Sequence, residues 1–397
     1  MLAVELLLGL ILAYAAVCSL YLATLCAAAL CYRPPAPPDA AASKPSWAVV
    51  VPAHNEASGI ADTVHSLRAM DWPPDRLSVH VIADNCDDDT GAVAEAAGAV
   101  IHVRRAPDDR GKGQALDWFF RQCRDAYATA DLVAIVDADT LVEAEFAQAM
   151  TAAFAAPATL AAQGFYGVRN PLESWRTSLA AAALALFHHV RPAGRDVLGG
   201  TVGLRGNGMA FRAGLLARLG WPAHGLVEDA EFTLDLLRDD IRVRYVAGAV
   251  VLAEMAATRR QADTQRRRWE GGRLALLRSH LPQLLHGIAP RNALPRLDAA
   301  LDLLTPPLTV LILAQCLAAA IAVLWRPWGW AAFMCLPLVS IGAVPLALWL
   351  RREPRIIWLR LLAAPAFVAW KLALYAKMPF GRAASAWTRT LRRGERP

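Results

Sequence analysis

The stretch "LVAIVDADTLVEAEF", Leu132 to Phe146, runs five apolar residues straight into two carboxylates, Asp137 and Asp139. A single alanine separates the two acids at the end of a predicted buried strand, residues 132–140. Aspartate often ends a strand simply by capping the turn that follows, so the pair alone does not define a site. The neighbouring segments have to decide between a capping turn and a binding site.

The middle of the chain alternates apolar strand-like runs with helix-like runs. We predict strands over residues 47–54, 77–85, 100–105 and 132–140, and helices over residues 59–70, 90–98 and 113–123. Near-continuous apolar strands separated by helices are typical of the α/β class, with a mostly parallel sheet covered on both faces. No P-loop or GxGxxG pattern is present, which disfavours P-loop nucleotidases and Rossmann dehydrogenases.

Polar residues follow several of these predicted strands. Asn55, Asp84, Asp137 and Asp139 all fall at the carboxyl ends of strands, where open α/β sheets bind their ligands. One capping turn would not produce this arrangement, so a binding site is favoured. An Asp-x-Asp pair offers the hard oxygen ligands that suit Mg²⁺ or Mn²⁺.

The composition indicates a membrane protein with a polar middle. Of 397 residues, 56% are apolar and 19% charged, and the mean hydropathy is +0.31. Leu6 to Leu30 carry no charge, and about 25 helical residues span a hydrocarbon core. We therefore expect a transmembrane helix in residues 1–32, and two more in residues 301–350 from the apolar runs Leu301–Trp325 and Trp328–Leu350. A cleaved signal peptide is the alternative, but the start "MLAVE" has no basic residue and the apolar run is too long.

The rest of the chain divides around these apolar runs. We expect a Pro-rich linker over residues 33–46, the α/β domain over 47–280, an interfacial helix over 281–300, and an interfacial or re-entrant segment with a basic tail over 351–397. Arg33 is the first basic residue, which places the α/β domain in the cytoplasm. Pro365 is expected to break the apolar stretch Ile356–Tyr375. The net charge of +6 lies largely near these segments, so anionic lipid explains it better than nucleic acid.

Three further motifs carry charged residues, each with an ordinary structural explanation. "RRAPDDRGKGQAL" offers Arg110 and Lys112 to a phosphate, or is solvated surface. Glu228 and Asp229 in "GLVEDAEFTLDLL" open an amphipathic helix, where acids also serve as N-terminal caps. "QRRRWEGG" suits a basic surface helix, or a helix with one face turned into the crevice.

In their order, these motifs resemble the membrane-bound family 2 glycosyltransferases, the group that includes cellulose, chitin and hyaluronan synthases. The similarity spans Trp47 to His280 through "VVVPAHNEA", "VIADNCDDDT", "RGKGQAL", "VDADT", "GLRGNGMAFR", "LVEDAEFTLDL" and "QRRRW", and apolar spans follow. The ending "KMPFGRAASAWTRTLRR" is similar to that of many bacterial exopolysaccharide transferases. Each piece is weak, but their joint order is specific.

The resemblance implies a GT-A nucleotide-sugar-binding fold flanked by transmembrane helices, and a role for each matching residue. Asp229 would be the catalytic base and Asp139 the metal ligand. The donor would be bound by Pro52, Asn55, Glu56, Asp84, Lys112, Asp137, Gln265 and Arg268. The acceptor would be bound by Asn207, Glu228 and Trp269. Ala83 stands where many relatives carry another Asp, which puts the selectivity for the base in question.

The implied activity is an inverting, metal-dependent transfer from a nucleotide-diphosphate sugar, with UDP as the expected nucleotide, to a membrane lipid or a growing surface glycan. A processive polysaccharide synthase and a catalytically silent sugar-nucleotide sensor or scaffold remain alternatives. The expected location is the bacterial inner membrane, multi-pass, with the catalytic domain in the cytoplasm. The expected partners are the donor, a lipid or saccharide acceptor, the membrane and further subunits of a biosynthetic complex, and no nucleic acid.

Overall fold

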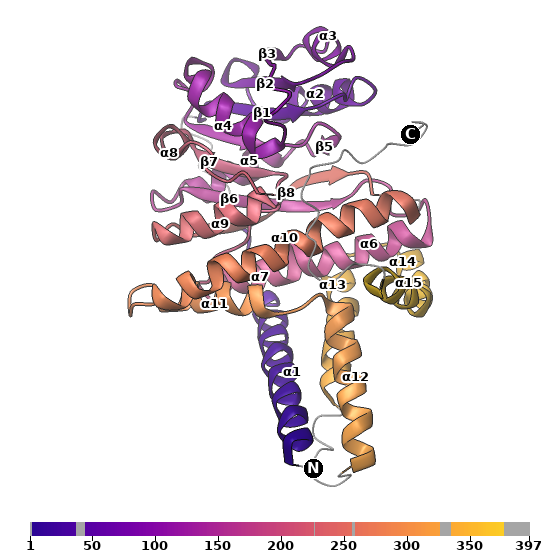
Figure 1. Cartoon of the computed structure of the whole chain (residues 1–397). Coiled ribbons are helices and arrows are strands. Elements are labelled where there is room, and N and C mark those ends of the chain that lie inside the picture. Colours follow the sequence, from indigo (N-terminus) through magenta and orange to yellow (C-terminus); the bar gives the residue numbers. More distant parts are fainter. Residues whose placement is uncertain (1, 37–43, 226, 256–258, 326–334, 377–397) are drawn as a thin grey trace. The chain divides into compact units, whose positions relative to one another are not determined.

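The computed structural model describes residues 2–36, 44–225, 227–255, 259–325 and 335–376 (Figure 1). Most of the predicted linker and the basic tail after residue 376 lie outside these ranges. The chain forms two compact units. Among the described residues, the helical unit comprises 2–32, 178–200, 277–325 and 335–376, and the sheet unit comprises 33–36, 44–177, 201–225, 227–255 and 259–276.

The sheet unit contains an eight-stranded sheet in the order β3-β2-β1-β4-β7-β6-β8-β5. Its strands are β1 (Trp47–Ala53), β2 (Leu77–Asp84), β3 (Val100–Arg104), β4 (Leu132–Ile135), β5 (Thr140–Val142), β6 (Ala161–Val168), β7 (Met209–Arg212) and β8 (Val243–Ala253). Its helices are α2 (Ile60–Arg68), α3 (Thr90–Ala96), α4 (Lys112–Gln122), α5 (Phe146–Phe154), α8 (Ala213–Leu219) and α9 (Glu228–Arg238), with short 3-10 turns η1 (Pro74–Arg76) and η2 (Arg124–Ala126). Four of the seven strand pairings are parallel, so the predicted mostly parallel α/β sheet is confirmed.

Helices cover both faces of this sheet because successive strand residues point to opposite sides. Val79 and Val81 of β2 join the core formed with α2, α3 and α5. His80, between them, faces the other way and lies 6.1 Å from the ring of Phe119 in α4. In α2, Ile60, Thr63, Val64 and Leu67 are buried, the i, i+3, i+4, i+7 spacing of one helical face.

One sequence prediction within the sheet is wrong. The run Leu132–Thr140 was expected to be a single strand, but β4 ends at Ile135 and β5 begins at Thr140. The chain turns between them, so that β4 lies in the middle of the sheet and β5 at its edge. Asp137 and Asp139 lie in this turn, outside the strand pairing, whereas in a continuous strand they would have been part of the sheet.

The helical unit is assembled from three stretches that are distant in sequence. Its elements are α1 (Leu2–Ala29), the π-helical turn η3 (Leu186–Val190), α7 (Arg191–Val197), α11 (Ala293–Leu304), α12 (Leu308–Trp325), α13 (Leu336–Leu350), α14 (Arg355–Arg360), the 3-10 turn η5 (Leu361–Ala363) and α15 (Ala364–Ala376). Two helices, α6 (Trp175–Ala185) and α10 (Arg259–His286), continue from one unit into the other. The expected domain over residues 47–280 therefore differs from the observed division, because Ser178–Gly200 belongs to the helical unit.

The helix boundaries after residue 280 also differ from those expected. Instead of one helix over residues 281–300, α10 ends at His286 and α11 begins at Ala293. The apolar run from Leu301 is interrupted because Pro306 and Pro307 lack the N–H groups a helix needs, and α12 begins at Leu308. The break expected at Pro365 is present, since α15 begins at Ala364.

One described helical segment, Gly9–Ala29 of α1, is long and apolar enough to cross a membrane. Ala293–Leu304 and Leu308–Ile321, bent by 72° to one another, would pass as a second span if they are counted together. The apolar helix Leu336–Leu350 is shorter.

Candidate active site

Lys112 and Asp137 meet where β4 ends. Asp137 follows the strand, and Lys112 is the first residue of α4. The Lys112 ammonium donates to Asp137 Oδ1 and to the carbonyl oxygen of Gly206. The predicted loop lysine and the first acid of the Asp-x-Asp pair are thus in direct contact.

Gly206 brings the acid of α9 into the same place. It adopts a left-handed conformation with φ of 76°, which favours glycine. A Cβ added to it would lie 3.4 Å from Lys112 Nζ and 3.5 Å from Asp229 Oδ2. The loop therefore passes closely between these side chains, and four separate segments of the sheet unit converge on one point.

In this cluster the acids Asp137, Glu228 and Asp229 surround Lys112, and their proximity shifts several pKa values. Burial and the charge of Asp229 raise the pKa of Glu228 to about 7, although Lys112 opposes the shift. Burial likewise raises the pKa of Asp229. Burial alone would lower the pKa of Lys112, but attraction from Asp137, Glu228 and Asp229 outweighs it and raises the pKa. The half-buried site holds more negative than positive charge.

This imbalance fits a divalent cation. Asp137 and Asp139 are half-buried, whereas Ala138 between them is buried and its carbonyl oxygen accepts a bond from Thr63. Within the described part of the chain, no three His, Cys, Asp or Glu side chains gather as a preformed metal site. The donor set therefore suits a hard ion that takes its remaining ligands from a diphosphate and water.

Three buried polar residues hold the site's loops. Asn207 Oδ1 accepts the Asp137 N–H at 3.1 Å, and its Nδ2 donates to Thr140 at 2.8 Å. Gln163 Nε2 donates to the Asn207 carbonyl oxygen at 2.8 Å, and Thr233 joins the Leu204 N–H to the Asp229 carbonyl oxygen. Gln163 and Thr233 were not predicted. The signal for Gln163 was a single amide within the apolar strand "AAQGFYGV".

Asp84, the expected reader of the base, is a buried member of an ion pair. Its Oδ1 accepts bonds from Arg104 at 2.7 Å and from Asn85 at 2.9 Å. Burial raises the pKa of Asp84, and Arg104 opposes the shift. Arg104 was not singled out from the sequence, yet it ends β3 at the position paired with Asp84.

The remaining donor residues surround the ends of β1 and β2. Pro52 lies in β1, beyond its last pair with β4. Asn55 Oδ1 accepts the Asp87 N–H at 2.8 Å, and the Glu56 N–H donates to Thr90 at 2.7 Å. In "NCDDDT", Asp88 Oδ1 accepts the Thr90 N–H at 3.0 Å, whereas Asp89, the N-cap residue of α3, makes no side-chain capping bond.

The "QRRRW" segment is helical, as predicted, and lies within α10. The side chains of Gln265, Arg268 and Trp269 fall outside the described part of the structure. The next turn of α10 is described, and a Cβ added to Gly272 would lie 2.7 Å from Val227 Cγ1. Val227 directly precedes Glu228, so this helix packs against the loop that carries the acids.

Acids and a lysine from separate loops thus gather at the strand ends of a mixed, mostly parallel sheet, where enzymes of the open α/β class bind their ligands. The chain belongs to the family described as glycosyltransferase like family 2, whose model matches residues 45–272. The predicted membership of the family 2 glycosyltransferases, with a GT-A-like α/β fold, is thereby confirmed, whereas the membrane-bound part of that prediction stays a prediction.

Two curated relatives illustrate the similarity. A β-monoglucosyldiacylglycerol synthase of Synechocystis is 30% identical over 235 residues, covering 57% of this chain and 48% of the relative. A UDP-forming cellulose synthase catalytic subunit of Pseudomonas fluorescens is 28% identical over 252 residues, covering 62% of this chain and 33% of the relative. The chain thus spans about half or less of these relatives' length.

A solved structure shares the fold. It is a mannosyltransferase of Pyrobaculum calidifontis in complex with GDP-Man and Mn²⁺, with a TM-score of 0.50 and 21% sequence identity. The match covers 85% of this chain and 99% of that one.

Proposed function

We propose that this protein is an inverting, metal-dependent glycosyltransferase that moves a sugar from a nucleotide-diphosphate donor, with UDP as the expected nucleotide, to a membrane lipid or a growing surface glycan. The observation that carries the proposal is the meeting of Lys112, Asp137 and Asp229 around Gly206. The family membership and a lipid-glucosylating relative support it.

The chain's own residues would divide the work by position. Asp229 would take the proton of the attacking acceptor hydroxyl, whose oxygen bonds to the anomeric carbon while the bond to the diphosphate breaks on the opposite face. Glu228 and Trp269 would contact the acceptor, and Asn207, being buried, would act by holding the Asp137 turn. Lys112, Gln265 and Arg268 would hold the diphosphate.

On the donor side, Asp84 and Arg104 would present one fixed carboxylate to the base, with Pro52, Asn55 and Glu56 lining the same strand ends. Asp139 would hold Mg²⁺ or Mn²⁺. When bound, such an ion offsets the negative charge that develops on the leaving diphosphate.

The proposed location is the bacterial inner membrane. The apolar helices α1, α12 and α13 would anchor the protein in the membrane. The sheet unit would lie in the cytoplasm, because Arg33 is the first basic residue after α1 and basic residues beside a membrane span favour the cytoplasmic side. The interfacial placement of α14, η5 and α15 belongs to the same proposal.

The central test is the metal. Asp139→Asn should abolish sugar transfer in membranes supplied with radiolabelled UDP- or GDP-sugars, because the neutral amide is a poor ligand for a hard cation. EDTA should reproduce the loss in the wild type, and Mn²⁺ or Mg²⁺ should restore activity to the wild type alone. Full activity in EDTA would refute the metal role.

A processive synthase is the second candidate, favoured by the cellulose synthase relatives. The described apolar helices form a small set from which to line a polymer channel, so we favour single addition. The size of the labelled product separates the two: a glycolipid supports single addition, and an ethanol-insoluble polymer supports the synthase.

A further inference from the structure

The turn that joins α13 to α14 displays an arginine in an unusual conformation. Arg352 has φ of 54°, a left-handed position that usually holds glycine. The turn is closed by the Glu353 N–H to the Leu348 carbonyl oxygen at 2.9 Å and the Arg352 N–H to the Trp349 carbonyl oxygen at 3.0 Å. Glycine adopts this conformation without the steric strain that a Cβ causes, so the arginine occupies the turn at some cost to stability.

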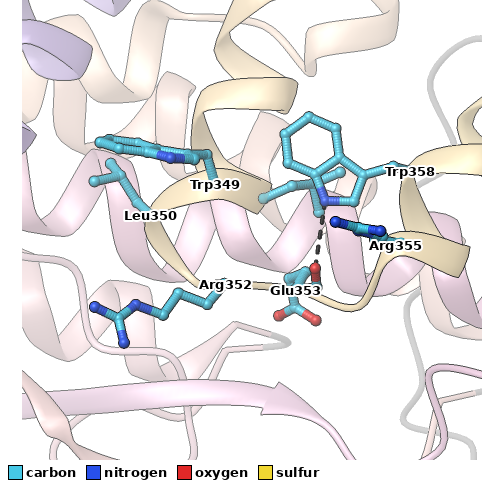
Figure 2. A pocket seen from close by; sticks show the side chains of 7 residues that line it. Trp349, Leu350, Arg352, Glu353, Arg355 and Trp358 are labelled. Carbon is cyan, nitrogen blue, oxygen red and sulfur yellow. Dashed lines mark hydrogen bonds between the residues drawn. The ribbon is translucent and has the colours of Figure 1, made fainter.

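A cavity of about 550 Å³ opens at this turn. Figure 2 shows Trp349 and Trp358 on either side of it, with the Arg355 guanidinium close to the Trp358 ring. The Trp358 indole N–H donates to the Glu353 carbonyl oxygen at 3.3 Å, which fixes that ring. The lining thus combines two indole rings with the charged side chains of Arg352, Arg355 and Glu353.

The charge of the lining favours an anion. Arg352 and Arg355 are exposed and positively charged, and they outnumber the single acid, Glu353. Burial raises the pKa of Glu353, although the charge of Arg351 opposes the shift. Guanidinium groups are well suited to phosphate because they donate paired, charge-assisted hydrogen bonds.

Exposed apolar side chains accompany the charged ones in this part of the chain. Trp349, which lines the cavity, is 62% exposed, and Leu359 and Leu362, which follow Trp358 in the chain, are 63% and 84% exposed. Large exposed apolar side chains close together in the chain favour an interaction site over a surface that faces water. Tryptophan and arginine beside such side chains are the composition found at membrane interfaces.

We propose that this cavity binds the phosphodiester headgroup of an anionic membrane phospholipid, with Arg355 on the phosphate beside the Trp358 ring, Arg352 adding positive charge on the other side of the turn, and the two indole rings against the glycerol backbone. The proposal rests on the membrane attachment that forms part of the proposed function. It concerns no residue that we place in sugar transfer.

The test is lipid binding to the full-length protein purified in dodecyl maltoside, measured by native mass spectrometry. The probes are dioctanoyl phosphatidylglycerol and dioctanoyl phosphatidylcholine. The wild type should prefer phosphatidylglycerol by at least roughly tenfold. Arg352→Gly combined with Arg355→Ala should abolish that preference, and the glycine also suits the turn, so the variant should fold. The double variant Arg352→Gly with Arg355→Lys keeps one positive charge, so it should show part of the preference that Arg352→Gly with Arg355→Ala loses.

The matched control removes two exposed arginines of the sheet unit, Arg121→Ala with Arg218→Ala, and should keep the preference. The proposal is overturned if the control loses the preference as fully as the test variant, or if the test variant keeps it. Competition by free glycerol 3-phosphate at the same concentration as the lipid would also overturn it, because that would indicate a solution phosphate site. Asp139→Asn should bind lipid normally, so a failure of the transferase proposal would be seen separately.

Discussion

At the scale of single residues, the surrounding charges and the burial of Glu228 and Asp229 determine how readily these two carboxyl groups accept a proton. Both carboxyl groups have raised pKa values, and that of Glu228 reaches about 7. A base with a pKa near the working pH accepts a proton efficiently and still occurs in its charged form. The sequence predicted the two acids, but it could not predict their protonation, because Lys112 and Asp137 lie more than 90 residues earlier in the chain.

Asp229→Asn should lower kcat by a factor on the order of 10²–10⁴ with little change in donor affinity, since the amide has the same shape but cannot accept the acceptor's proton. Single-turnover assays and donor-binding titrations measure the two effects separately. Equal losses of both would instead assign Asp229 to the nucleotide site.

Glu228→Gln serves as the companion variant. It removes the neighbouring negative charge, so the pKa of Asp229 should fall. Because the deprotonated base is the active form, the wild-type rate should decline as the pH falls through the raised pKa of Asp229, and in Glu228→Gln that decline should begin at lower pH.

The ion pair between Asp84 and Arg104 follows from the register of strands β2 and β3. Two parallel strands that end together place their last residues side by side, and Asp84 and Arg104 are those residues in β2 and β3. The strands were predicted to within a residue or two, so this ion pair could have been found from them. The role of Asn207 could not be predicted in this way. Asn207 holds the turn between β4 and β5, and the sequence predicted one continuous strand there.

At the scale of elements, glycines in α10 set how closely that helix approaches the acids. An added Cβ at Gly272 would lie 2.7 Å and 2.8 Å from the two Val227 methyl groups, whereas at Gly271 it would meet nothing within 4 Å. Both glycines follow "QRRRW", and the sequence alone does not distinguish them. Only the packing assigns a role to the second.

Gly272→Ala should therefore push α10 away from the loop before Glu228 and reduce sugar transfer by roughly 10–100-fold, because a displacement of about 1 Å in a site has such effects. Gly271→Ala should keep full activity and stabilise the helix by about 0.5–1 kcal/mol. Activity and thermal unfolding of the two variants provide the comparison. Equal activity in both would show that α10 does not position the site.

At the scale of the whole molecule, the division into units was the feature least predictable from the sequence. Composition located the apolar ends and the α/β middle, but Ser178–Gly200 lies inside that middle and packs in the helical unit. A Cβ on Gly194 would lie 2.3 Å from the Leu25 carbonyl oxygen, so α7 lies directly on the backbone of α1. Contacts between segments so far apart in sequence leave no periodic pattern to detect.

A buried polar network joins three segments of the helical unit. Asp298 of α11 accepts bonds from Tyr21 of α1 and from Arg195 of α7, each at 2.8 Å. Arg195, whose side chain is 3% exposed, also pairs with Asp302 at 3.0 Å. The network therefore fastens the N-terminal apolar helix to helices about 170 and 280 residues further along the chain.

Asp298→Ala should destabilise the helical unit by about 3–5 kcal/mol, because it leaves the buried guanidinium of Arg195 undercompensated. Tyr21→Phe removes one hydrogen bond and should cost about 1 kcal/mol. If the two side chains act through their mutual bond, adding Tyr21→Phe to Asp298→Ala should cost almost nothing more. Denaturant unfolding of the purified full-length protein in detergent measures all three variants. Additive losses would show that Tyr21 and Asp298 stabilise the unit independently, and not through their mutual bond.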